Sequence, residues 1–144
     1  MDFLGNTNCD SHLSFQLIKT TNKIMVYLIG GAARVGKTTL AKMILKRKEI
    51  PFDSTDMLWH AFKESQPERN WKAGWENIPD QFFPFLRKFV DHALRTLPEY
   101  VIEGDSFFPS HANALIKEFK VKACFLGSSN MNLTDIKKYA QHNI

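Results

Sequence analysis

One segment of the sequence has the residue types and the spacing to bind a polyphosphate. Residues 31–38 read Gly-Ala-Ala-Arg-Val-Gly-Lys-Thr, which matches the Walker A (P-loop) pattern G-x-x-x-x-G-K-[ST] in full. Its glycines let the backbone curl so that successive N–H groups point at phosphate oxygens. Lys37 is expected to reach the β- and γ-phosphates, and the Thr38 hydroxyl to ligate Mg²⁺. The segment therefore predicts a nucleotide site with ATP and Mg²⁺ as cofactors, bound by Gly31, Ala32, Ala33, Arg34, Val35, Gly36, Lys37, Thr38 and Thr39.

The elements on either side of this loop have the order that the pattern requires. Residues 25–29 are continuously apolar, as expected for a central parallel strand that is buried on both faces. Gly30 is expected to end this strand. A helix over 38–48 would follow the loop and direct the positive end of its dipole at the phosphates. Its expected buried side chains are Leu40, Met43, Ile44 and Leu45.

Strand-like and helix-like runs then alternate along the chain, which predicts an α/β fold with a parallel sheet and helices on both faces. Strands are expected at residues 25–29, 49–53, 100–103 and 121–126, and helices at 38–48, 56–64, 80–97, after 110 to about 119, and from about 134 to the end. Ser54 or Thr55 is expected to cap the second helix and Asp80 the third. The predicted buried stripes of these two helices are Met57, Leu58, Ala61 and Phe62, and Phe83, Leu86, Val90 and Leu94.

Acidic residues follow the second and third predicted strands. In such a sheet a ligand lies beyond the carboxyl ends of the strands, where carboxylates can hold Mg²⁺ and align an acceptor hydroxyl. Asp56 either serves the acceptor or stabilises the dipole of its own helix. Glu103 or Asp105 is expected to organise Mg²⁺. Asp53 is expected to be a turn residue that bonds its own backbone. Together with Lys37, the acids Asp56, Glu103 and Asp105 form the predicted catalytic set, and Thr38, Glu103 and Asp105 form the predicted metal set.

Four segments resemble the small P-loop kinases. This group includes the nucleoside monophosphate kinases and the adenylate kinase-like and 2-phosphoglycerate kinase-like proteins. They are Ile29-Gly-Gly-Ala-Ala-Arg-Val-Gly-Lys-Thr-Thr-Leu-Ala, Pro51-Phe-Asp-Ser-Thr-Asp, Val101-Ile-Glu-Gly-Asp-Ser-Phe and Ala123-Cys-Phe-Leu-Gly. The resemblance implies a three-layer P-loop NTPase fold. In this fold the third strand lies beside the first, the second strand outside the third, and the fourth on the other flank. It also implies that Asp56 faces the phosphate acceptor and that Glu103 is the acid before glycine on the third strand.

The resemblance has a gap near the end of the chain. Such kinases continue into a lid with arginines and a fifth strand, whereas this sequence has no arginine after Arg95 and ends at Ile144. Lys137 or Lys138 would have to substitute for the missing arginines. Arg34 in the loop is either a partial replacement or a solvated loop residue. Residues 25–144 are therefore expected to form a kinase-like domain that is incomplete at its C-terminus. Residues 1–24 are expected to be a poorly ordered extension, with Met25 as the hypothetical natural start.

Composition excludes several other classes of protein. The formal net charge of +4 is too mild and scattered to indicate a nucleic-acid partner. Cys9 and Cys124 give no disulfide framework, which fits the cytoplasm. The apolar runs are too short to cross a membrane, and the first residues do not resemble a secretory signal. Guanine specificity is not expected either, because no Asn-Lys-x-Asp segment follows the loop.

Aromatic residues crowd the segment between the second and third strands, and most are expected to pack in the core. Trp71 or Trp75 is a candidate for the wall of a substrate site within the ordered loop 65–79, with Lys63, Arg69 and Lys72 nearby. The leading hypothesis is an ATP-dependent phosphotransferase acting on a small hydroxyl- or phosphate-bearing acceptor. The alternative is a catalytically impaired nucleotide-binding protein, the remnant of a truncated kinase.

Overall fold

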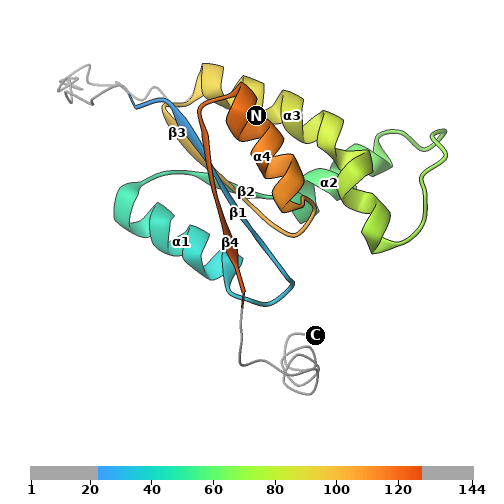
Figure 1. Cartoon of the computed structure of the whole chain (residues 1–144), viewed down its shortest axis with the longest axis horizontal. Helices are drawn as coiled ribbons and strands as arrows, with labels where there is room; N and C mark the ends of the chain where they lie inside the picture. The colour runs from blue at the N-terminus through green and yellow to red at the C-terminus, as the bar shows by residue number, and fades with distance from the viewer. Residues whose placement is uncertain (1–22, 128–144) are drawn as a thin grey trace, which may run out of the picture.

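The structure is a computed structural model that describes residues 23–127. At its centre is a sheet in the order β2-β3-β1-β4 (Figure 1), formed by β1 (Met25–Gly31), β2 (Phe52–Ser54), β3 (Glu99–Glu103) and β4 (Val121–Leu126). All three neighbouring pairs are parallel. The third strand therefore lies beside the first, the second outside it and the fourth on the other flank, which confirms the strand order that the resemblance implies.

Helices cover both faces of this sheet. Helix α1 (Lys37–Lys48) lies on one face, and α3 (Ile78–Thr96) and α4 (Pro109–Glu118) lie on the other (Figure 1). Helix α2 (Thr55–Glu64) follows β2 directly, and a short 3₁₀ turn, η1 (Trp75–Asn77), leads into α3. The layers, strand order and strand–loop–helix connection confirm the predicted α/β class, the three-layer P-loop NTPase fold.

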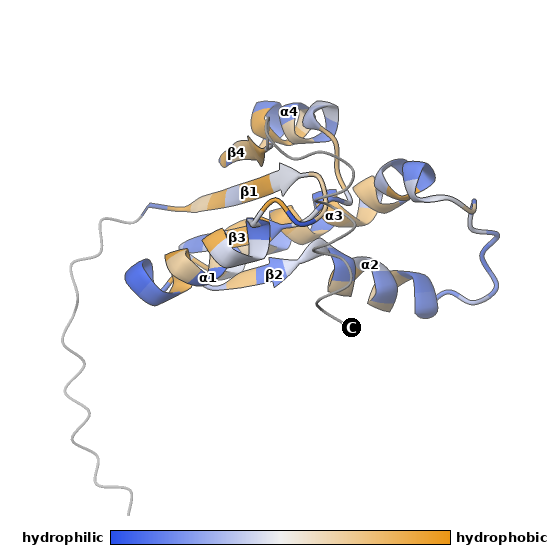
Figure 2. Cartoon of the chain, turned by 90° about the horizontal axis from the view of Figure 1, so that it is seen from below, coloured by the Kyte–Doolittle hydropathy of each residue, from blue (hydrophilic) through white to orange (hydrophobic). Residues whose placement is uncertain are grey.

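Successive side chains of the central strands point to opposite faces of the sheet, and both sets are apolar, so helices cover both faces. Ile29 of β1 and Val101 of β3 pack with Ala41 of α1 in one buried cluster. Their strand neighbours Leu28 and Ile102 belong to the larger cluster on the opposite face. Parallel strands that are buried on both sides need such continuous apolar runs, and Figure 2 shows β1 as mostly hydrophobic.

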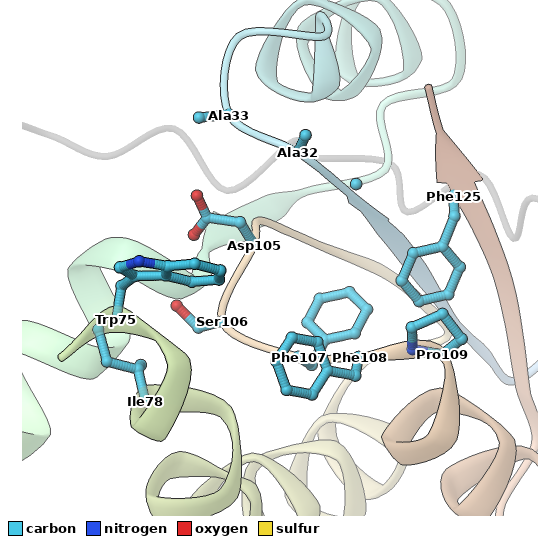
Figure 3. Close-up of a pocket in the computed structure, with 11 residues that line it drawn as sticks. Ala32, Ala33, Trp75, Ile78, Asp105, Ser106, Phe107, Phe108, Pro109 and Phe125 are labelled. Atoms are coloured by element: carbon cyan, nitrogen blue, oxygen red, sulfur yellow. The ribbon is translucent and has the colours of Figure 1, made fainter. Parts of the chain in front are cut away.

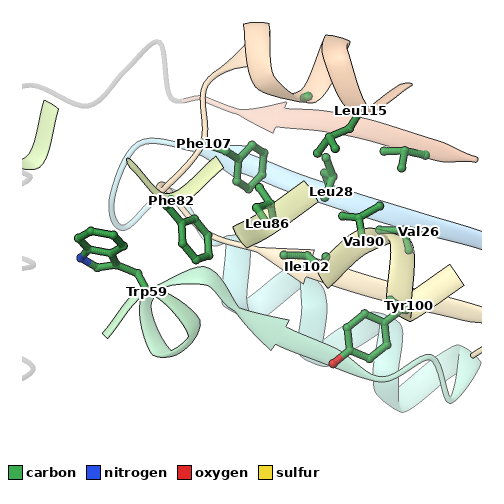
Figure 4. Packing of buried hydrophobic residues seen from close by; sticks show 13 residues of the cluster. Val26, Leu28, Trp59, Phe82, Leu86, Val90, Tyr100, Ile102, Phe107 and Leu115 are labelled. Atoms are coloured by element: carbon green, nitrogen blue, oxygen red, sulfur yellow. The ribbon is translucent and has the colours of Figure 1, made fainter. Parts of the chain in front are cut away.

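The larger cluster depends on one side of α3. Phe82, Leu86 and Val90 are fully buried, and they pack with sheet residues such as Leu28 and Ile102 (Figure 4). Their spacing of four residues places them on one face of the helix. Burial of each such side chain contributes about 1.5–3 kcal/mol, so this stripe anchors the helix that leads toward β3.

The predicted buried faces of α1 and α2 are partly wrong, because packing against the sheet buries other residues than the pattern predicts. Met43 and Leu45 are exposed, whereas Ala41 is buried against the sheet. In α2 the buried residues are Thr55 and Trp59, while Met57 is 65% exposed.

Helix α3 begins at Ile78, two residues before Asp80, so Asp80 lies in the first turn rather than at the cap. Its stripe runs through Phe82 and Ala93, while Phe83 and Leu94 are only partly buried. Pro84 lies inside this helix.

The second strand also begins later than predicted. Glu49 ends α1 in a left-handed conformation, φ 58°, and its N–H donates to the Leu45 carbonyl. Pairing with β3 starts only at Phe52. Because β2 extends to Ser54, the Ser54 hydroxyl caps α2 by accepting from the Asp56 N–H at 3.3 Å.

Several predictions concern residues that the structure does not describe. The extension over 1–24 falls there except for its last two residues, and the helix from about 134, with Lys137 and Lys138, falls there entirely. None of the helices in the described ranges is both long and apolar enough to span a membrane.

Candidate functional site

The loop between β1 and α1 has the backbone geometry of a phosphate cradle. Gly31 has φ 134°, and a side chain there would meet the Leu126 carbonyl oxygen of β4 at 2.2 Å. Gly36 has φ 94° and caps α1, yet a Cβ built on it meets nothing within 4 Å. The positive φ and the open space together leave room for a phosphate against the N-terminus of α1.

Lys37 is the first residue of α1 and folds back over this loop. Its ammonium donates to the Ala32 carbonyl at 2.6 Å, and the residue is only 8% exposed. Lysine is rarely buried unless its charge is paired. A phosphate bound in the loop would pair with this ammonium, which is the role predicted for Lys37.

Thr38 and Glu103 meet across the site. The Thr38 hydroxyl donates to Glu103 Oε1 at 3.0 Å. Glu103 ends β3 opposite Ile29 of β1, and it is only 2% exposed. Strand β3 therefore places its last carboxylate beside the first turn of α1, as the predicted metal set requires.

Gly104 carries the chain from Glu103 to Asp105 through a close contact with α2. It has φ 155°, and a Cβ on it would lie 1.7 Å from Thr55 Oγ1. The same fully buried hydroxyl accepts from the Ser106 N–H at 3.4 Å. Thr55 therefore fixes the loop after β3 to the start of α2, a role that the sequence reasoning did not assign to it.

The third acid of the predicted catalytic set joins the same cluster. Asp56, in the first turn of α2, is exposed as a residue, but its carboxyl is partly shielded from water. This desolvation is the main cause that raises its pKa; a hydrogen bond and charge interaction with Asp105 and the charge of Glu103 raise it further, while Lys37 opposes them. The structure thus brings Asp56, Glu103, Asp105 and Lys37 together at one edge of the sheet.

The donor chemistry of this cluster fits Mg²⁺ bound together with phosphates. Thr38 and Glu103 offer a hydroxyl and a carboxylate, the hard oxygen donors that Mg²⁺ prefers. Within residues 23–127, no group of three or more His, Cys, Asp or Glu side chains could hold a metal by itself. Mg²⁺ commonly needs only one or two carboxylates when substrate phosphates and water complete its shell.

One acid prediction is wrong. Asp53 lies within β2 instead of a turn, and its carboxylate accepts a hydrogen bond from the Tyr100 hydroxyl of the neighbouring strand. Burial and this bond to Asp53 raise the pKa of Tyr100. The register that pairs β2 with β3 brings the two side chains together, and the sequence does not show that register.

A cavity of about 570 Å³ opens beside the loop (Figure 3). One part of the wall is the start of the phosphate loop, and another comes from η1 and α3 through Trp75 and Ile78. The segment after Gly104 and one residue of β4 complete it, with Asp105, Ser106, Phe107, Phe108, Pro109 and Phe125. Its volume lies in the range of small-molecule sites.

Of the two tryptophans predicted as candidates for the wall of a substrate site, one lies in the core and one lines the cavity. Trp71 packs edge-on against Trp59 and donates to the Gln66 carbonyl, so it belongs to the aromatic core. Trp75 is 77% exposed and lines the cavity. The phenylalanines at 107, 108 and 125 were missed as site residues, although Phe-Phe-Pro directly after Gly104-Asp105-Ser106 at a strand end was a usable signal.

The three basic residues considered near an acceptor lie elsewhere. Arg69 stacks over the Trp71 ring at 4.2 Å, and the Lys72 N–H donates to Gln81. Neither they nor Lys63 line the cavity. His111 lies between the Phe108 N–H and the Asp80 carboxylate.

Comparison with known proteins gives no family assignment. No protein-family model and no curated protein matches the sequence. Similar solved structures include shikimate kinase from Bacteroides thetaiotaomicron, which is 13% identical with a TM-score of 0.39, over 82% of this chain and 75% of that chain. A similarity of this size assigns no activity to the chain.

Proposed function

We propose that this chain is an ATP-dependent phosphotransferase that transfers the γ-phosphoryl group to a hydroxyl of a small molecule. The observation that carries the proposal is the convergence of Lys37, Thr38 and Glu103. From the first turn of α1 come an ammonium that folds back over the loop and a hydroxyl, and they meet a buried carboxylate of β3 at the carboxyl edge of the sheet. Phosphoryl transfer depends mainly on such positioning and charge stabilisation.

The donor side of the reaction uses the loop and the start of α1. The N–H groups around Gly36 and the α1 dipole hold the phosphates, and the Lys37 ammonium turns from the Ala32 carbonyl to the β- and γ-phosphates. Thr38 and Glu103 would hold Mg²⁺ together with the phosphates. When bound, Mg²⁺ neutralises charge on the phosphate oxygens.

The acceptor side uses the two acids after β2 and β3. Asp105 lies in the wall of the cavity beside the loop and is placed to receive a proton from an acceptor hydroxyl. The hydroxyl oxygen forms a bond to the γ-phosphorus while the bond to the β,γ-bridging oxygen breaks, and that electron pair leaves with ADP. The hydroxyl proton passes to the Asp105 carboxylate, and Asp56, whose carboxyl interacts with that of Asp105, orients it.

Acceptor-dependent release of ADP by the full chain tests this proposal. ADP formation with Mg·ATP should rise well above the rate with water alone for at least one hydroxyl compound. The same acceptor should give no ADP with Asp105→Asn, whereas Glu118→Gln, on the surface at the end of α4, should behave as the wild type. An acceptor that is phosphorylated equally fast by Asp105→Asn would contradict the role given to the carboxylate.

One observation favours a second candidate, a protein that binds nucleotide without turnover. Arginines stabilise charge in phosphoryl transfer and are worth about 10³–10⁵ in rate. In the described part of the chain, Arg87 pairs with Glu118, Arg95 with Asp91, and Arg69 stacks on Trp71. Arg47 is in the last turn of α1, at the end of the helix away from the phosphate loop. Arg34 is the arginine of the loop itself. Mg·ATP binding with no turnover on any acceptor would support this second candidate.

A further inference from the structure

We infer that the cavity beside the phosphate loop takes an uncharged aromatic alcohol as the phosphate acceptor, its ring between the aromatic walls and its hydroxyl toward Asp105. The inference rests on the proposed function for the reaction and adds the class of acceptor. It is carried by the composition of the cavity wall, its charge and the exposure of its aromatic residues.

The wall is apolar and aromatic on two opposite sides. Figure 3 shows the Trp75 indole on one side and the rings of Phe107, Phe108 and Phe125 on the other. Phe107 and Phe125 pack edge to face with their centroids 5.7 Å apart, so these two rings support each other. A flat apolar group between the two sides would contact ring surface on both.

Three aromatic side chains that line the cavity are also exposed to solvent. Trp75 is 77% exposed, and Phe108 and Phe125 are also more than a third exposed. Single exposed apolar side chains are ordinary, whereas several around one hollow indicate a binding site. Met57 is the contrasting case, because it is 65% exposed on α2 and does not line the cavity.

The charge of the wall opposes an anionic acceptor. None of the described residues that line the cavity is Lys, Arg or His, and its one ionisable side chain is Asp105. A phosphate or carboxylate on the acceptor would lie near that carboxylate without a cation in the wall to pair with it. Burial of an unpaired charge is costly, so an uncharged acceptor is favoured over a nucleoside monophosphate or a hydroxy acid.

The ionisable group of the cavity lies at its phosphate-loop end. In Figure 3 the Asp105 carboxylate lies nearest to Ala32 and Ala33 of the phosphate loop, whereas Ser106 lies beyond the Trp75 indole. A hydroxyl at this end reaches Asp105 next to the loop that holds the donor. The aromatic remainder of the molecule then points toward Trp75 and Phe108, away from the phosphates.

A matched pair of probes tests the charge preference. Both 3-phenylpropane-1,2-diol and 3-phenyllactate carry a benzyl group and a hydroxyl, but the second replaces a hydroxymethyl group by a carboxylate. We expect the full chain to bind the diol at least about tenfold more tightly in calorimetry, because the carboxylate of 3-phenyllactate would be repelled by Asp105. Equal or tighter binding of 3-phenyllactate would overturn the inference.

A second arm tests the aromatic wall. Trp75→Ala should weaken diol binding by about tenfold. Met57→Ala, which removes another exposed apolar side chain outside the cavity, should leave it unchanged. Both positions are at the surface, so both variants should fold. An unchanged affinity in Trp75→Ala would overturn the inference.

A third arm separates this inference from the proposed function. Mg·ATP binding is measured on the same samples and should be equal in the wild type and Trp75→Ala. If Mg·ATP binds but the diol does not, the acceptor class is wrong while the nucleotide site stands. If the diol preference holds but Mg·ATP does not bind, the cavity assignment stands and the phosphotransferase proposal fails.

Discussion

The Thr38 hydroxyl donates a hydrogen bond of 3.0 Å to the Glu103 carboxylate, across 65 residues of sequence. The bond links the first turn of α1 to the last residue of β3, so the phosphate loop and the acids after β3 form one site. Glu103 is buried, and a buried carboxylate needs such a partner or a cation. Mg²⁺ beside Thr38 would supply that cation.

Glu103→Gln should separate the charge of this residue from its hydrogen bond. Glutamine can still accept from Thr38, so thermal stability should change little, but the charge that favours Mg²⁺ is lost. Loss of such a metal partner typically costs about 10–100-fold in metal affinity or activity, and we expect ADP formation to fall by that factor with a higher Mg²⁺ requirement.

The matched control is Glu99→Gln. Glu99 lies at the other end of β3 and accepts from the Tyr27 hydroxyl at 2.6 Å, so the same chemical change is made on the same strand away from the site. An equal loss of Mg²⁺ dependence in both variants would show that the effect does not come from the site.

Gly36→Ala and Gly104→Ala should affect different properties, although both glycines have positive φ. A Cβ on Gly36 meets nothing within 4 Å, so this variant should fold, at a strain cost of about 1–3 kcal/mol. Its methyl group would occupy space for phosphate, and Mg·ATP affinity should fall at least about tenfold.

In contrast, a Cβ on Gly104 would clash with Thr55 Oγ1. Overpacking adds typically about 1–3 kcal/mol to the strain, so Gly104→Ala should be the less stable variant in chemical denaturation. The assignment of the two glycines is wrong if Gly104→Ala is as stable as the wild type, or if Gly36→Ala binds Mg·ATP normally.

Asp56→Asn should change how stability depends on pH. Because the pKa of Asp56 is raised in the folded state above its ordinary value of 3.8, its ionisation costs more free energy in the folded chain than in the unfolded chain. The contribution of Asp56 to stability is therefore fully present below that ordinary value, and it is lost as pH rises through the raised pKa.

The melting temperature of Asp56→Asn relative to the wild type should accordingly increase from acidic to neutral pH, by a few degrees. Because Asp105 is one cause of the raised pKa, adding Asp105→Asn should give less than the sum of the two single changes. A difference between Asp56→Asn and the wild type that does not vary with pH would contradict the shared environment of the two acids.

The sequence predicts those parts of the fold and site that lie within one contiguous segment or at the common end of the parallel strands. The strand, loop and helix around residues 31–38 follow from contiguous patterns, and the acids 56, 103 and 105 follow from the rule that parallel strands end together. The strand order came from the resemblance and not from periodicity, because no pattern along one strand states which strand lies beside it.

The parts that the sequence does not predict depend on contacts between distant elements. Asp53 resembles a turn residue until the β2–β3 register brings it to Tyr100. Met43 of α1 has the right hydrophobicity for the core, but Ala41 takes the position nearest the sheet. The cavity combines residues from four separate segments, so its aromatic wall becomes visible only when the chain is folded.

Calorimetric titration of Mg·ATP into the full chain, beside its Lys37→Ala and Lys42→Ala variants, tests the central claim most directly. Lys42 is exposed on the same helix as Lys37, so both variants remove one positive charge from α1. We predict saturable binding to the wild type and Lys42→Ala, and at least about a tenfold loss in Lys37→Ala. No binding to the folded wild type, or equal binding to all three, would contradict the account.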